Sequence, residues 1–534
     1  MARAVVLRLA VVVVLVFAAQ YAWVSPANFE GYDEWLVLSL ASQGIVQHPP
    51  ANRPLSLLFN LVPAIVFPHD LRGVYLVHGA YLAATGVVAM LLVLACLPGR
   101  RRLALLAGVF TVVWAPSDVI RLAPLYAIPY SGVGLALMAA VLLLVESWRR
   151  ARPFLLVAAV VVASVAARCY EGVIPLLVFA PALLPLARGG DRPRLRYWLG
   201  TWTAMTAVLL ALVVIPWWRA SPETTYQRAL LKPDARPTAL LGRLAQQYVL
   251  HLRPLVAFDA ADVVSIAVPL TVVVFVASYA WVCRGRDEET PPSETRRLSI
   301  AALVGLAAAG LGYAPFLLSA HLAGARRTQF FSSAGIAMFL AAGIGLVATR
   351  LHGRAHRIVP AVLGAWVVAV GTARTLDMQQ GWDSHSYFRV QHAVLRQLTH
   401  QAPELKPHTL VVLLDDVGAW PADFTFRHAV SYVYPGRAVG HVEPAADDIY
   451  YPTRFTSGGI RIEPWALIRE AWRSPVDLYR WDEVVVFHFG LDGRLQLLME
   501  WPAALPALPA GARYDPRARI DAAPAPVPSR AILG

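Results

Sequence analysis

Two acidic residues follow the first apolar segment of the chain closely, within the sequence FEGYDEW at Phe29–Trp35. Asp33 and Glu34 would then lie just above a membrane, where a carboxylate can act as a general base on a lipid-borne substrate. The alternative is structural, because Asp and Glu ahead of Trp-Leu-Val-Leu favour the start of a helix. The sequence therefore offers this pair either as candidate catalytic residues or as a helix cap.

Several arginines could bind a phosphate group. The pair Arg326 and Arg327, in HLAGARRTQFF, stands directly before an apolar segment. Arg53, Arg121 and Arg168 are further candidates on the same predicted side of the membrane. A guanidinium group suits phosphate because it offers two donors at once. For the Arg326-Arg327 pair, the alternative is contact with a phospholipid headgroup.

Two more acids stand between apolar runs. Glu171 occurs in ARCYEGVIPLL beside Arg168, and Asp118 occurs in APSDVIRLAP one helical turn from Arg121. Ionisable groups in such positions usually face a cavity or a charged partner. Both acids are therefore candidate substrate-binding residues, and the alternative for each is a salt bridge with its neighbouring arginine.

Aromatic residues and paired acids elsewhere have ordinary structural explanations. Four aromatic residues could stack on sugar rings, but they are more typical of an aromatic belt at the membrane interface: Tyr126, Tyr130, Trp217 and Trp218. The pairs Asp415-Asp416 and Asp447-Asp448 could bind a metal but are more typical of turns. No Gly-rich phosphate loop, HExxH or paired CxxC occurs, and the predicted cytoplasmic loops lack a DxD motif. These absences argue against direct use of a nucleotide sugar, and a divalent metal cofactor is left open.

The composition is that of a membrane protein. Hydrophobic residues make up 57% of the 534 residues, charged residues 15%, and the mean hydropathy is +0.53. Soluble domains have roughly 45–50% apolar and about 25% charged residues. The net charge of +13 is concentrated in short loops between apolar segments, where cations fix membrane topology. Membrane lipids are therefore the expected partners, and a nucleic acid is not.

The apolar segments predict about eleven membrane-spanning helices, since a span needs roughly 20 residues. They are Val5–Trp23, Val74–Leu97, Leu103–Trp114, Leu125–Val145, Pro153–Ala167, Val173–Leu186, Trp198–Pro216, Val263–Val282, Leu298–Leu318, Phe330–Ala348 and Ile358–Thr372. Every dense arginine cluster except Arg326-Arg327 falls in the loops on one side, which predicts a cytoplasmic N-terminus and an outer C-terminus. This pattern holds only if Arg53–Phe67 lies in the outer interface instead of crossing the membrane.

The predicted fold is mostly α, with a small α/β domain at the C-terminal end. Residues 1–374 form the membrane domain, with outer loops at 24–73 and 217–262. Residues 375–500 form the α/β domain, with helices near Phe388–Leu398 and Pro464–Trp472. Its strands are expected at Thr409–Leu414, Glu483–Phe489 and Arg494–Glu500. Residues 501–534, rich in Pro and Ala, are expected to be extended or disordered.

The membrane region resembles the GT-C glycosyltransferases, a superfamily that includes protein O-mannosyltransferases, aminoarabinose transferases and mycobacterial arabinosyltransferases. The resemblance rests on the first helix, the Asp-Glu pair in the loop after it, the Arg-Pro-Leu step at Arg53 and about ten further spans. It extends from Met1 to about Arg374. It implies transfer of a sugar from a polyprenyl-phosphate carrier to a cell-envelope glycan, lipid or protein, with Asp33 as the catalytic acid of the family and Glu34 beside it.

That chemistry suits the candidate residues. Inverting transfer needs a carboxylate to take the acceptor's proton, and cations or a metal to stabilise the departing phosphate. Two other classes of function remain open on the sequence alone. One is a multi-pass transporter or lipid flippase, and the other is a non-catalytic membrane assembly protein that acts through its C-terminal domain.

Overall fold

The structure is a computed structural model, and its contacts divide the chain into two compact units. The helical unit comprises Met1–Asn28, Ala51–Phe67 and Leu71–Gly381, and the α/β unit comprises Phe29–Pro50, Pro68–Asp70 and Trp382–Gly534. The residues that the structure describes are 3–26, 28–29, 33–43, 53–67, 71–187, 192–219, 236–257, 265–282, 293–317, 329–444, 450–471, 474–521 and 527–533.

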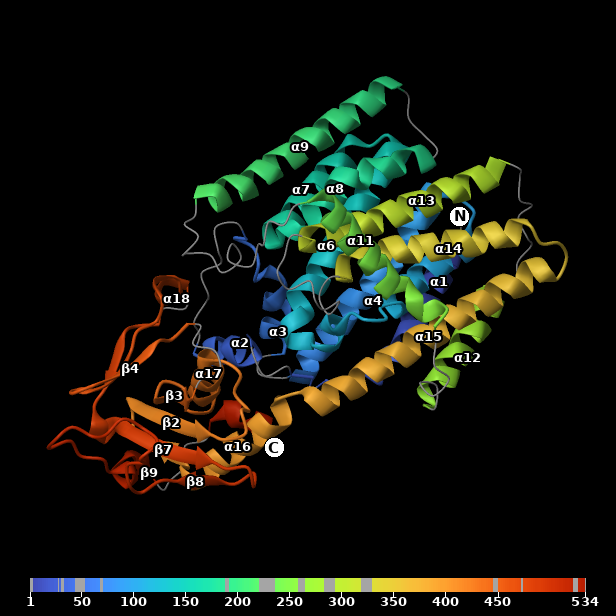
Figure 1. The fold of residues 1–534 in the computed structure, drawn as a ribbon. Helices are drawn as coiled ribbons and strands as arrows, with labels where there is room; N and C mark the ends of the chain where they lie inside the picture. The colour runs from blue at the N-terminus through green and yellow to red at the C-terminus, as the bar shows by residue number, and fades with distance from the viewer. Residues whose placement is uncertain are drawn as a thin grey trace. The chain divides into compact units, whose positions relative to one another are not determined.

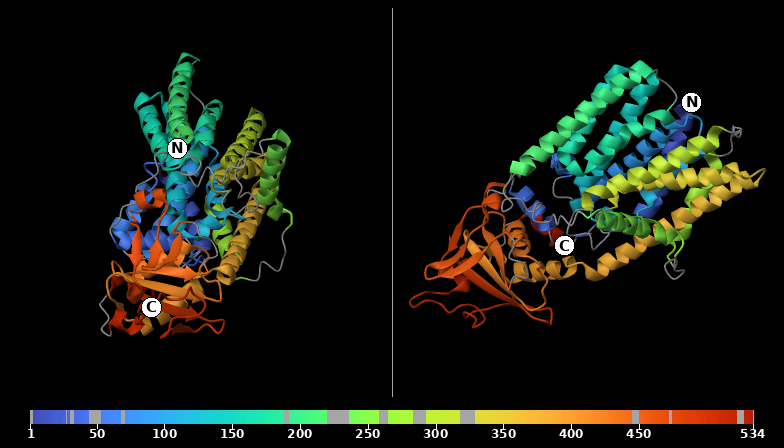
Figure 2. Two further views of the ribbon diagram at one scale, coloured as in Figure 1. Left: turned by 60° about the vertical axis from the view of Figure 1, so that its left-hand side comes forward. Right: turned by 45° about the horizontal axis from the view of Figure 1, so that its top comes forward.

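Most of the longer helices of the helical unit run along a broadly common direction, and α11 crosses them (Figures 1 and 2). Its longer helices are α1 Arg3–Tyr21, α4 Leu71–Cys96, α5 Arg101–Val113, α6 Pro124–Arg150, α7 Pro153–Cys169, α9 Arg192–Arg219, α11 Pro237–Leu252, α12 Ala267–Val282, α13 Ser293–Tyr313, α14 Ser333–Thr349 and α15 Ala355–His385, the last of which ends in the α/β unit. Short helices are α3 Leu61–Val66, α8 Ile174–Phe179 and the 3-10 turns η1 Leu58–Asn60, η2 Val119–Leu122, η3 Glu171–Val173, η4 Ala180–Leu186, η6 Arg253–Leu255, η8 Ala314–Phe316 and η10 Phe330–Ser332.

Seven described helices are long and apolar enough to cross a membrane, which confirms a chain compatible with a multi-pass membrane protein. The seven are the helices α1, α4, α6, α9, α13, α14 and α15. Each of the eleven predicted segments coincides with helical structure, but four of them are shorter: α5, α7, α12 and the run from η3 to η4. The count of about eleven spans therefore stays a prediction.

Small residues allow the helices of this unit to pack closely. Helices α13 and α14 lie side by side (Figure 1), and Gly305 and Gly335 face each other across their contact. A Cβ on Gly335 would meet the Ala309 backbone nitrogen at 2.5 Å. Close approach of backbones at small residues is typical of helix pairs in membranes, where apolar burial alone does not drive association.

The segment that the sequence places in the membrane interface is too short to cross a membrane. After Arg53 the chain forms η1 and α3, which together span fewer residues than a membrane-crossing helix requires. Its apolar side chains are exposed, with Ile65 at 76% and Val66 at 57% exposure. The position of this segment at the membrane surface stays a prediction.

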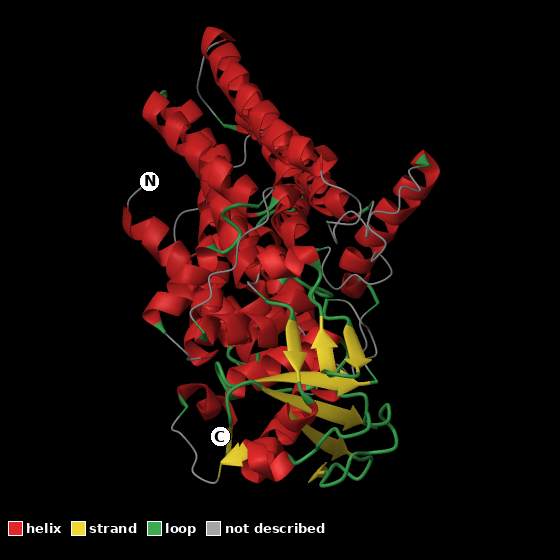
Figure 3. Ribbon diagram, turned by 90° about the vertical axis from the view of Figure 1, so that its left-hand side faces the viewer, coloured by secondary structure: helices red, strands yellow, loops and turns green. Residues whose placement is uncertain are grey.

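All described strands belong to the α/β unit (Figure 3). They are β1 Glu404–Leu405, β2 Thr409–Asp415, β3 Ala438–Glu443, β4 Thr453–Thr456, β5 Gly459–Ile462, β6 Asp477–Tyr479, β7 Val484–Phe489, β8 Leu495–Leu497 and β9 Ile520–Asp521. Its helices are α2 Asp33–Ser42, α16 Phe388–Gln401, α17 Asp423–Val433 and α18 Ala466–Ala471, with 3-10 turns η11 Trp481–Glu483, η12 Pro516–Arg519 and η13 Pro528–Leu533. The small α/β domain is thus confirmed.

The main sheet has the order β3-β2-β7-β8, in which β2 is parallel to β3 and β7, and β8 is antiparallel. Alternate residues of β2 point to opposite faces, so Val411 and Leu413 enter one core while Leu410 and Val412 enter the other. A parallel sheet buried on both faces reads as a continuous apolar run, which explains the sequence TLVVLLD of β2.

Helix α2 belongs to this unit, whereas the sequence predicts that its segment is a loop of the membrane domain. Helix α2 packs against α17, with Trp35 in the core on one side of the sheet and Leu36 and Leu40 in the core on the other. The physical reason is burial, because a ten-residue helix with this many apolar residues needs a core to cover them.

The end of the chain is also folded onto the α/β unit, although the sequence predicts an extended or disordered tail from Trp501. Its described part has little regular structure, but Leu505 and Leu533 are buried in the cores. The Tyr514 hydroxyl accepts from the backbone nitrogen of Val486 at 3.0 Å and donates to the carbonyl of Leu498 at 2.8 Å. Proline disfavours helices and strands because it lacks a backbone N–H, but it does not prevent side chains of an irregular segment from packing in a core.

Candidate functional site

The acidic pair Asp33 and Glu34 opens helix α2 in the α/β unit. Both carboxylates lie in its first turn, where the positive end of the helix dipole favours negative charge. Asp33 is half-buried and Glu34 is buried. The helix start that was the alternative to catalysis is therefore present, and Asp33 is the more accessible of the two carboxylates.

The next residue, Trp35, anchors α2 in the unit. It is fully buried, and its indole Nε1 donates a 2.6 Å hydrogen bond to Oε1 of Gln391 on α16. Gln391 in turn donates from Nε2 to the carbonyl of Ala419 at 2.8 Å. Four aromatic rings surround the indole at centroid distances of 5.9 to 6.5 Å: Phe29, Phe388, Trp420 and Tyr432.

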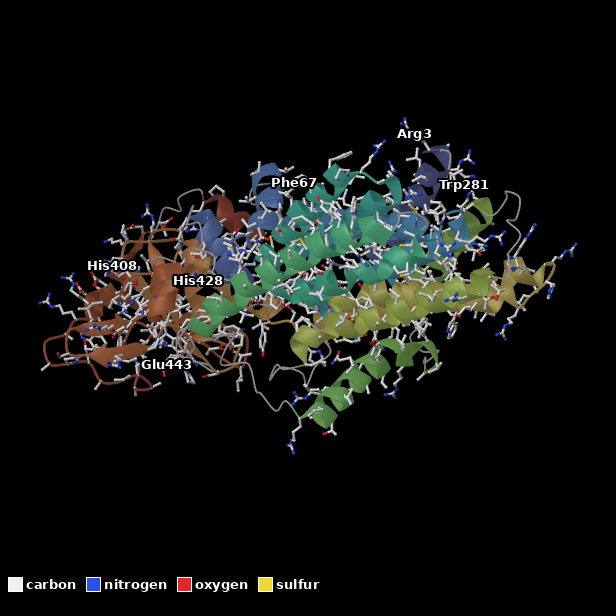
Figure 4. The ribbon with its side chains drawn as sticks, turned by 90° about the horizontal axis from the view of Figure 1, so that it is seen from above. Arg3, Phe67, Trp281, His408, His428 and Glu443 are labelled. Carbon is white, nitrogen blue, oxygen red and sulfur yellow. The ribbon has the colours of Figure 1, made fainter. Side chains whose placement is uncertain are left out.

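A buried chain of polar side chains starts on the same helix. Ser39 Oγ lies 3.4 Å from Nδ1 of His428 on α17, whose Nε2 lies 3.2 Å from the hydroxyl of Tyr451. That hydroxyl lies 3.0 Å from Ser474 Oγ. Burial lowers the pKa of His428 to about 3, and the charge of Arg427 acts in the same direction. The imidazole, labelled in Figure 4, is therefore neutral and links α2 to α17 by hydrogen bonds.

Arg427 is the charged member of this cluster. Its Nη2 donates to Asp477 at 2.8 Å, and its guanidinium lies 4.5 Å from the ring centroid of Tyr451. Its Nη1 is buried and has no hydrogen-bond partner among the described residues. Sequence reasoning missed Arg427 and His428, because an Arg-His pair on a short helix carries no motif that marks it as buried.

In the helical unit, the structure brings together two predicted site residues, Arg53 and Glu171. Arg53 Nε and Nη2 donate to the two carboxylate oxygens at 2.6 and 2.5 Å, and the guanidinium lies 4.5 Å from the ring centroid of Tyr170. Burial alone would lower the pKa of Arg53, but the hydrogen bond and charge of Glu171 raise it overall. Glu171 therefore pairs with Arg53, and Arg168 instead donates to the carbonyl of Leu212 at 3.2 Å.

This ion pair holds the segment that begins at Arg53 against the end of α7. Arg53 and Glu171 are 20% and 27% exposed at their side chains. The backbone nitrogen of Leu55 donates to the carbonyl of Arg168 at 3.2 Å, and Cys169 Sγ donates to the carbonyl of Leu55 at 3.0 Å. A structural role for the pair is thus established by its contacts, whether or not it also binds substrate.

Neutralising one member of the pair should destabilise the helical unit. We expect Arg53→Gln or Glu171→Gln to cost about 1–3 kcal/mol, between the values for exposed and buried pairs. The double variant should recover part of the loss, which thermal unfolding of all four proteins in detergent would show as a coupling energy. Arg374→Gln is the matched control, because its pair with Asp377 is 32% and 45% exposed and should change stability by less than about 1 kcal/mol. A coupling energy of zero would contradict the prediction.

Asp118 and Arg121 also meet, in and beside η2. Asp118 Oδ2 lies 3.9 Å from Arg121 Nε, and both side chains are buried. Arg121 Nη1 and Nη2 donate to the carbonyls of Val112 and Thr111, each at 2.9 Å, and so cap the C-terminal end of α5. Burial lowers the pKa of Arg121, and the charge of Asp118 opposes that shift.

Two polar residues that carry no signal in the sequence are linked to this guanidinium, His251 through the charge of Arg121 and Gln329 through the neighbouring Phe330. His251, at the end of α11, is bonded through Nδ1 to the Tyr313 hydroxyl at 2.7 Å, and burial with the charge of Arg121 lowers its pKa to about 3. Gln329 Oε1 accepts from Ser117 Oγ at 2.6 Å across 212 residues of sequence. The ring of Phe330, which follows Gln329, lies 5.9 Å from the Arg121 guanidinium.

Three atoms of these residues are buried without a hydrogen-bond partner in the part of the chain that the structure describes: Arg121 Nε, His251 Nε2 and Gln329 Nε2. When the Tyr313 hydroxyl donates to Nδ1 of His251, Nε2 carries the proton, and all three atoms are then donors. Buried donors without partners cost about 1–3 kcal/mol each. We call Arg121, His251 and Gln329 the donor cluster.

A small cavity lined in part by Arg121 is not a substrate pocket. Gln20, Arg121 and Thr375 contribute polar atoms to its lining, and the other lining residues are mainly apolar. Its volume of about 20 Å³ holds roughly one water molecule, whereas pockets for small-molecule ligands measure about 300–1,000 Å³.

The other candidates fall into two groups. Arg326, Arg327, Asp447 and Asp448 lie outside the described residues, as do the side chains of Tyr126, Trp217 and Trp218. Tyr130 packs edge-on against Tyr170 with ring centroids 5.2 Å apart. Asp415 accepts hydrogen bonds from the backbone nitrogens of the turn after β2, as its structural interpretation predicts. Within the described ranges, no three His, Cys, Asp or Glu side chains are grouped to hold a metal ion.

Comparison with known proteins adds no assignment. No protein-family model matches the chain, and a search of curated proteins found no similar sequence.

Proposed function

We propose that this protein is a membrane glycosyltransferase that moves a sugar from a polyprenyl-phosphate carrier to an acceptor on the outer face of the membrane. The supporting architecture is a helical unit compatible with a multi-pass membrane protein, joined in one chain to a folded α/β unit. In this proposal the N-terminus is cytoplasmic, the α/β unit is extracytoplasmic, and the exposed apolar face of α3 lies in the outer interface.

The observation that carries the proposal is the donor cluster. It combines a buried guanidinium with an amide and an imidazole, and each has an unused polar atom in the described part of the helical unit. A phosphate group accepts hydrogen bonds from several directions, and its negative charge favours a guanidinium with an unused N–H donor. Gln329 stands two residues after Arg327 in the sequence, so the predicted phosphate-binding pair is close along the chain to one member of the donor cluster.

The proposed reaction is inverting transfer. The acceptor oxygen attacks the anomeric carbon, and the bond from that carbon to the phosphate oxygen breaks. Asp33 takes the acceptor's proton, and the polyprenyl phosphate leaves with the electron pair. A cation or a set of hydrogen-bond donors must stabilise the charge that develops on the leaving phosphate.

The first test is turnover by the purified full-length protein in lipid nanodiscs. A panel of radiolabelled polyprenyl-phosphate sugars, supplied with cell-envelope acceptors or with water alone as acceptor, should include one that is consumed. Farnesyl phosphate, a short carrier without sugar, should compete with it. If no sugar of the panel is consumed, and labelled lipid instead crosses the bilayer of sealed vesicles, the flippase alternative replaces the enzyme.

Gln329→Glu should raise the KM for the donor about 10- to 150-fold, since a hydrogen bond to a charged group contributes about 1.5–3 kcal/mol. The substitution preserves shape and the acceptor for Ser117, but it replaces an unused N–H donor with a charge that repels phosphate. Gln329→Met is the neutral control of similar volume and should raise the donor KM much less. Equal KM values for the two variants would remove Gln329 from the donor site.

A further inference from the structure

Helix α11 of the helical unit has the reverse of the side-chain pattern that a helix in water has. Its polar residues Arg243, Gln247 and His251 recur every four residues on one side, and the last two are buried. On the other side, Leu241 and Val249 are 65% and 56% exposed. A helix on a soluble protein buries its apolar residues, whereas a helix in a membrane turns its ionisable groups toward the protein interior. The pattern of α11 is therefore that of a helix with lipid on its outer side.

The first half of α11 is bonded to α13, one of the helices that can cross a membrane. The segment of α13 long and apolar enough to cross is Thr295–Phe316. Arg243 Nη1 donates to the carbonyl of Leu317, just past the end of that segment, at 2.8 Å. The Tyr248 hydroxyl donates to the carbonyl of Leu306, in the middle of the segment, at 2.5 Å. Helix α11 thus passes from the end of α13 toward its middle.

The chain directly after α11 is bonded to the middle of α15, a second helix that can cross a membrane. The carbonyl of Leu255 accepts from Trp366 Nε1 of α15 at 3.0 Å. Trp366 lies about 16 Å along the helix axis from Ala355, the first residue of α15, and half of a bilayer core is about 15 Å thick. A helix that ends inside hydrocarbon leaves carbonyls that need donors, and the indole supplies one. The exposed apolar surface continues across this contact, since Val256 is 88% exposed and Val362 of α15 is 59% exposed.

We propose that α11 is a re-entrant helix, which enters the membrane where α13 ends and reaches the middle of the bilayer beside Trp366. In this position Leu241, Val249 and Val256 contact the acyl chains of phospholipids. The 16 residues of α11 extend over about 24 Å, which is enough to reach the middle of the core at a tilt but too short to cross it. Figure 1 shows α11 on this course from α13 toward α15.

This placement goes beyond the proposed function and does not depend on it. It follows from the side-chain pattern of α11 and from its hydrogen bonds to α13 and α15. The sequence analysis treats residues 217–262 as an outer loop, because α11 contains too few consecutive apolar residues to be recognised as a span. In the proposal, part of that loop lies within the membrane.

The test measures membrane depth with a nitroxide on Leu241→Cys, Val249→Cys or Val256→Cys in the full-length protein in phospholipid nanodiscs. The native cysteines are first replaced by alanine: Cys96, Cys169 and Cys283. Electron paramagnetic resonance then compares collisions with O₂, which is enriched in the bilayer, and with a water-soluble nickel chelate. We expect the label at position 256 to be about 10–15 Å deeper than the label at position 241, since half of a bilayer core is about 15 Å.

Two exposed positions on either side of the start of α15 serve as matched references. Val362→Cys should report the same depth as Val256→Cys, and Arg354→Cys should be fully accessible to the nickel chelate. If the variants without native cysteines do not fold, photolabelling of the wild type with a diazirine phospholipid provides a second measurement. Peptides that contain Val249 and Val256 should then carry the label.

Three results would overturn the proposal. Equal depths at the three positions of α11 would describe a helix that lies flat on the membrane surface. Access of the nickel chelate to position 256, as at position 354, would place the end of α11 in water. Protection of all three positions from both reagents, with no photolabel on their peptides, would mean that protein covers this face, as in contact with a second copy of the chain.

Discussion

Asp33→Asn is expected to lower the rate of sugar transfer by about 10²–10⁴-fold, the typical contribution of a general base. The amide has nearly the same shape as the carboxylate but cannot take the acceptor's proton. Asn is also well tolerated at a helix start, so α2 should still form and thermal unfolding should change little. The measurement is consumption of a radiolabelled polyprenyl-phosphate sugar by the purified full-length variant.

Two further variants make this result specific. Asp492→Asn removes a carboxylate that is 61% exposed in the same unit, and it should have wild-type turnover. Glu34→Gln changes a buried neighbour of Asp33 and should affect stability more than rate. Wild-type turnover by Asp33→Asn would leave only the helix-capping role and would remove the carboxylate from the mechanism.

Trp35→Ala should destabilise the α/β unit by about 3–5 kcal/mol, the usual cost of truncating a large buried aromatic residue. The indole has no exposed surface, contacts four aromatic rings and makes one side-chain hydrogen bond. Hydrogen exchange of β2 and β7 in the full-length protein would report this loss as weaker protection. Helices of the helical unit should keep their protection in the same experiment.

Trp465→Ala is the matched control, because the Trp465 side chain is 45% exposed in the same unit. Its main aromatic contact is edge-on with Tyr450, so its removal should cost much less. If Trp35→Ala left protection of β2 and β7 unchanged, α2 would not be part of the core that holds this unit together.

Local patterns in the sequence predict much of the secondary structure. Long apolar runs can be satisfied only by helices in a membrane, since every backbone polar group must be paired within its own segment. The prediction therefore found helical structure at each of the eleven segments. The run at Thr409–Leu414 predicted β2 for the same kind of local reason, because a buried parallel strand is apolar on both faces. The number of these helices that cross the membrane stays a prediction.

The candidate site residues could also be predicted in part from the sequence, whereas their partners could not. The sequence selected Asp33, Arg53, Glu171, Asp118 and Arg121 from their charge within or beside apolar surroundings. It could not pair Arg53 with Glu171, which are 118 residues apart, and it favoured the neighbour Arg168. Such pairs are defined by the tertiary structure, which brings together residues that are far apart along the chain.

The sequence by itself determined a helix-rich chain compatible with a multi-pass membrane protein, a small α/β domain after it, and an acidic pair at a helix start, because each depends on hydrophobic pattern or local capping. The tertiary structure decided that this helix belongs to the α/β unit, since Trp35 packs against rings drawn from residues 388–432, far along the chain. It also decided that Gln329 and His251 are linked to Arg121, because burial and unused donors are properties of packing between distant segments.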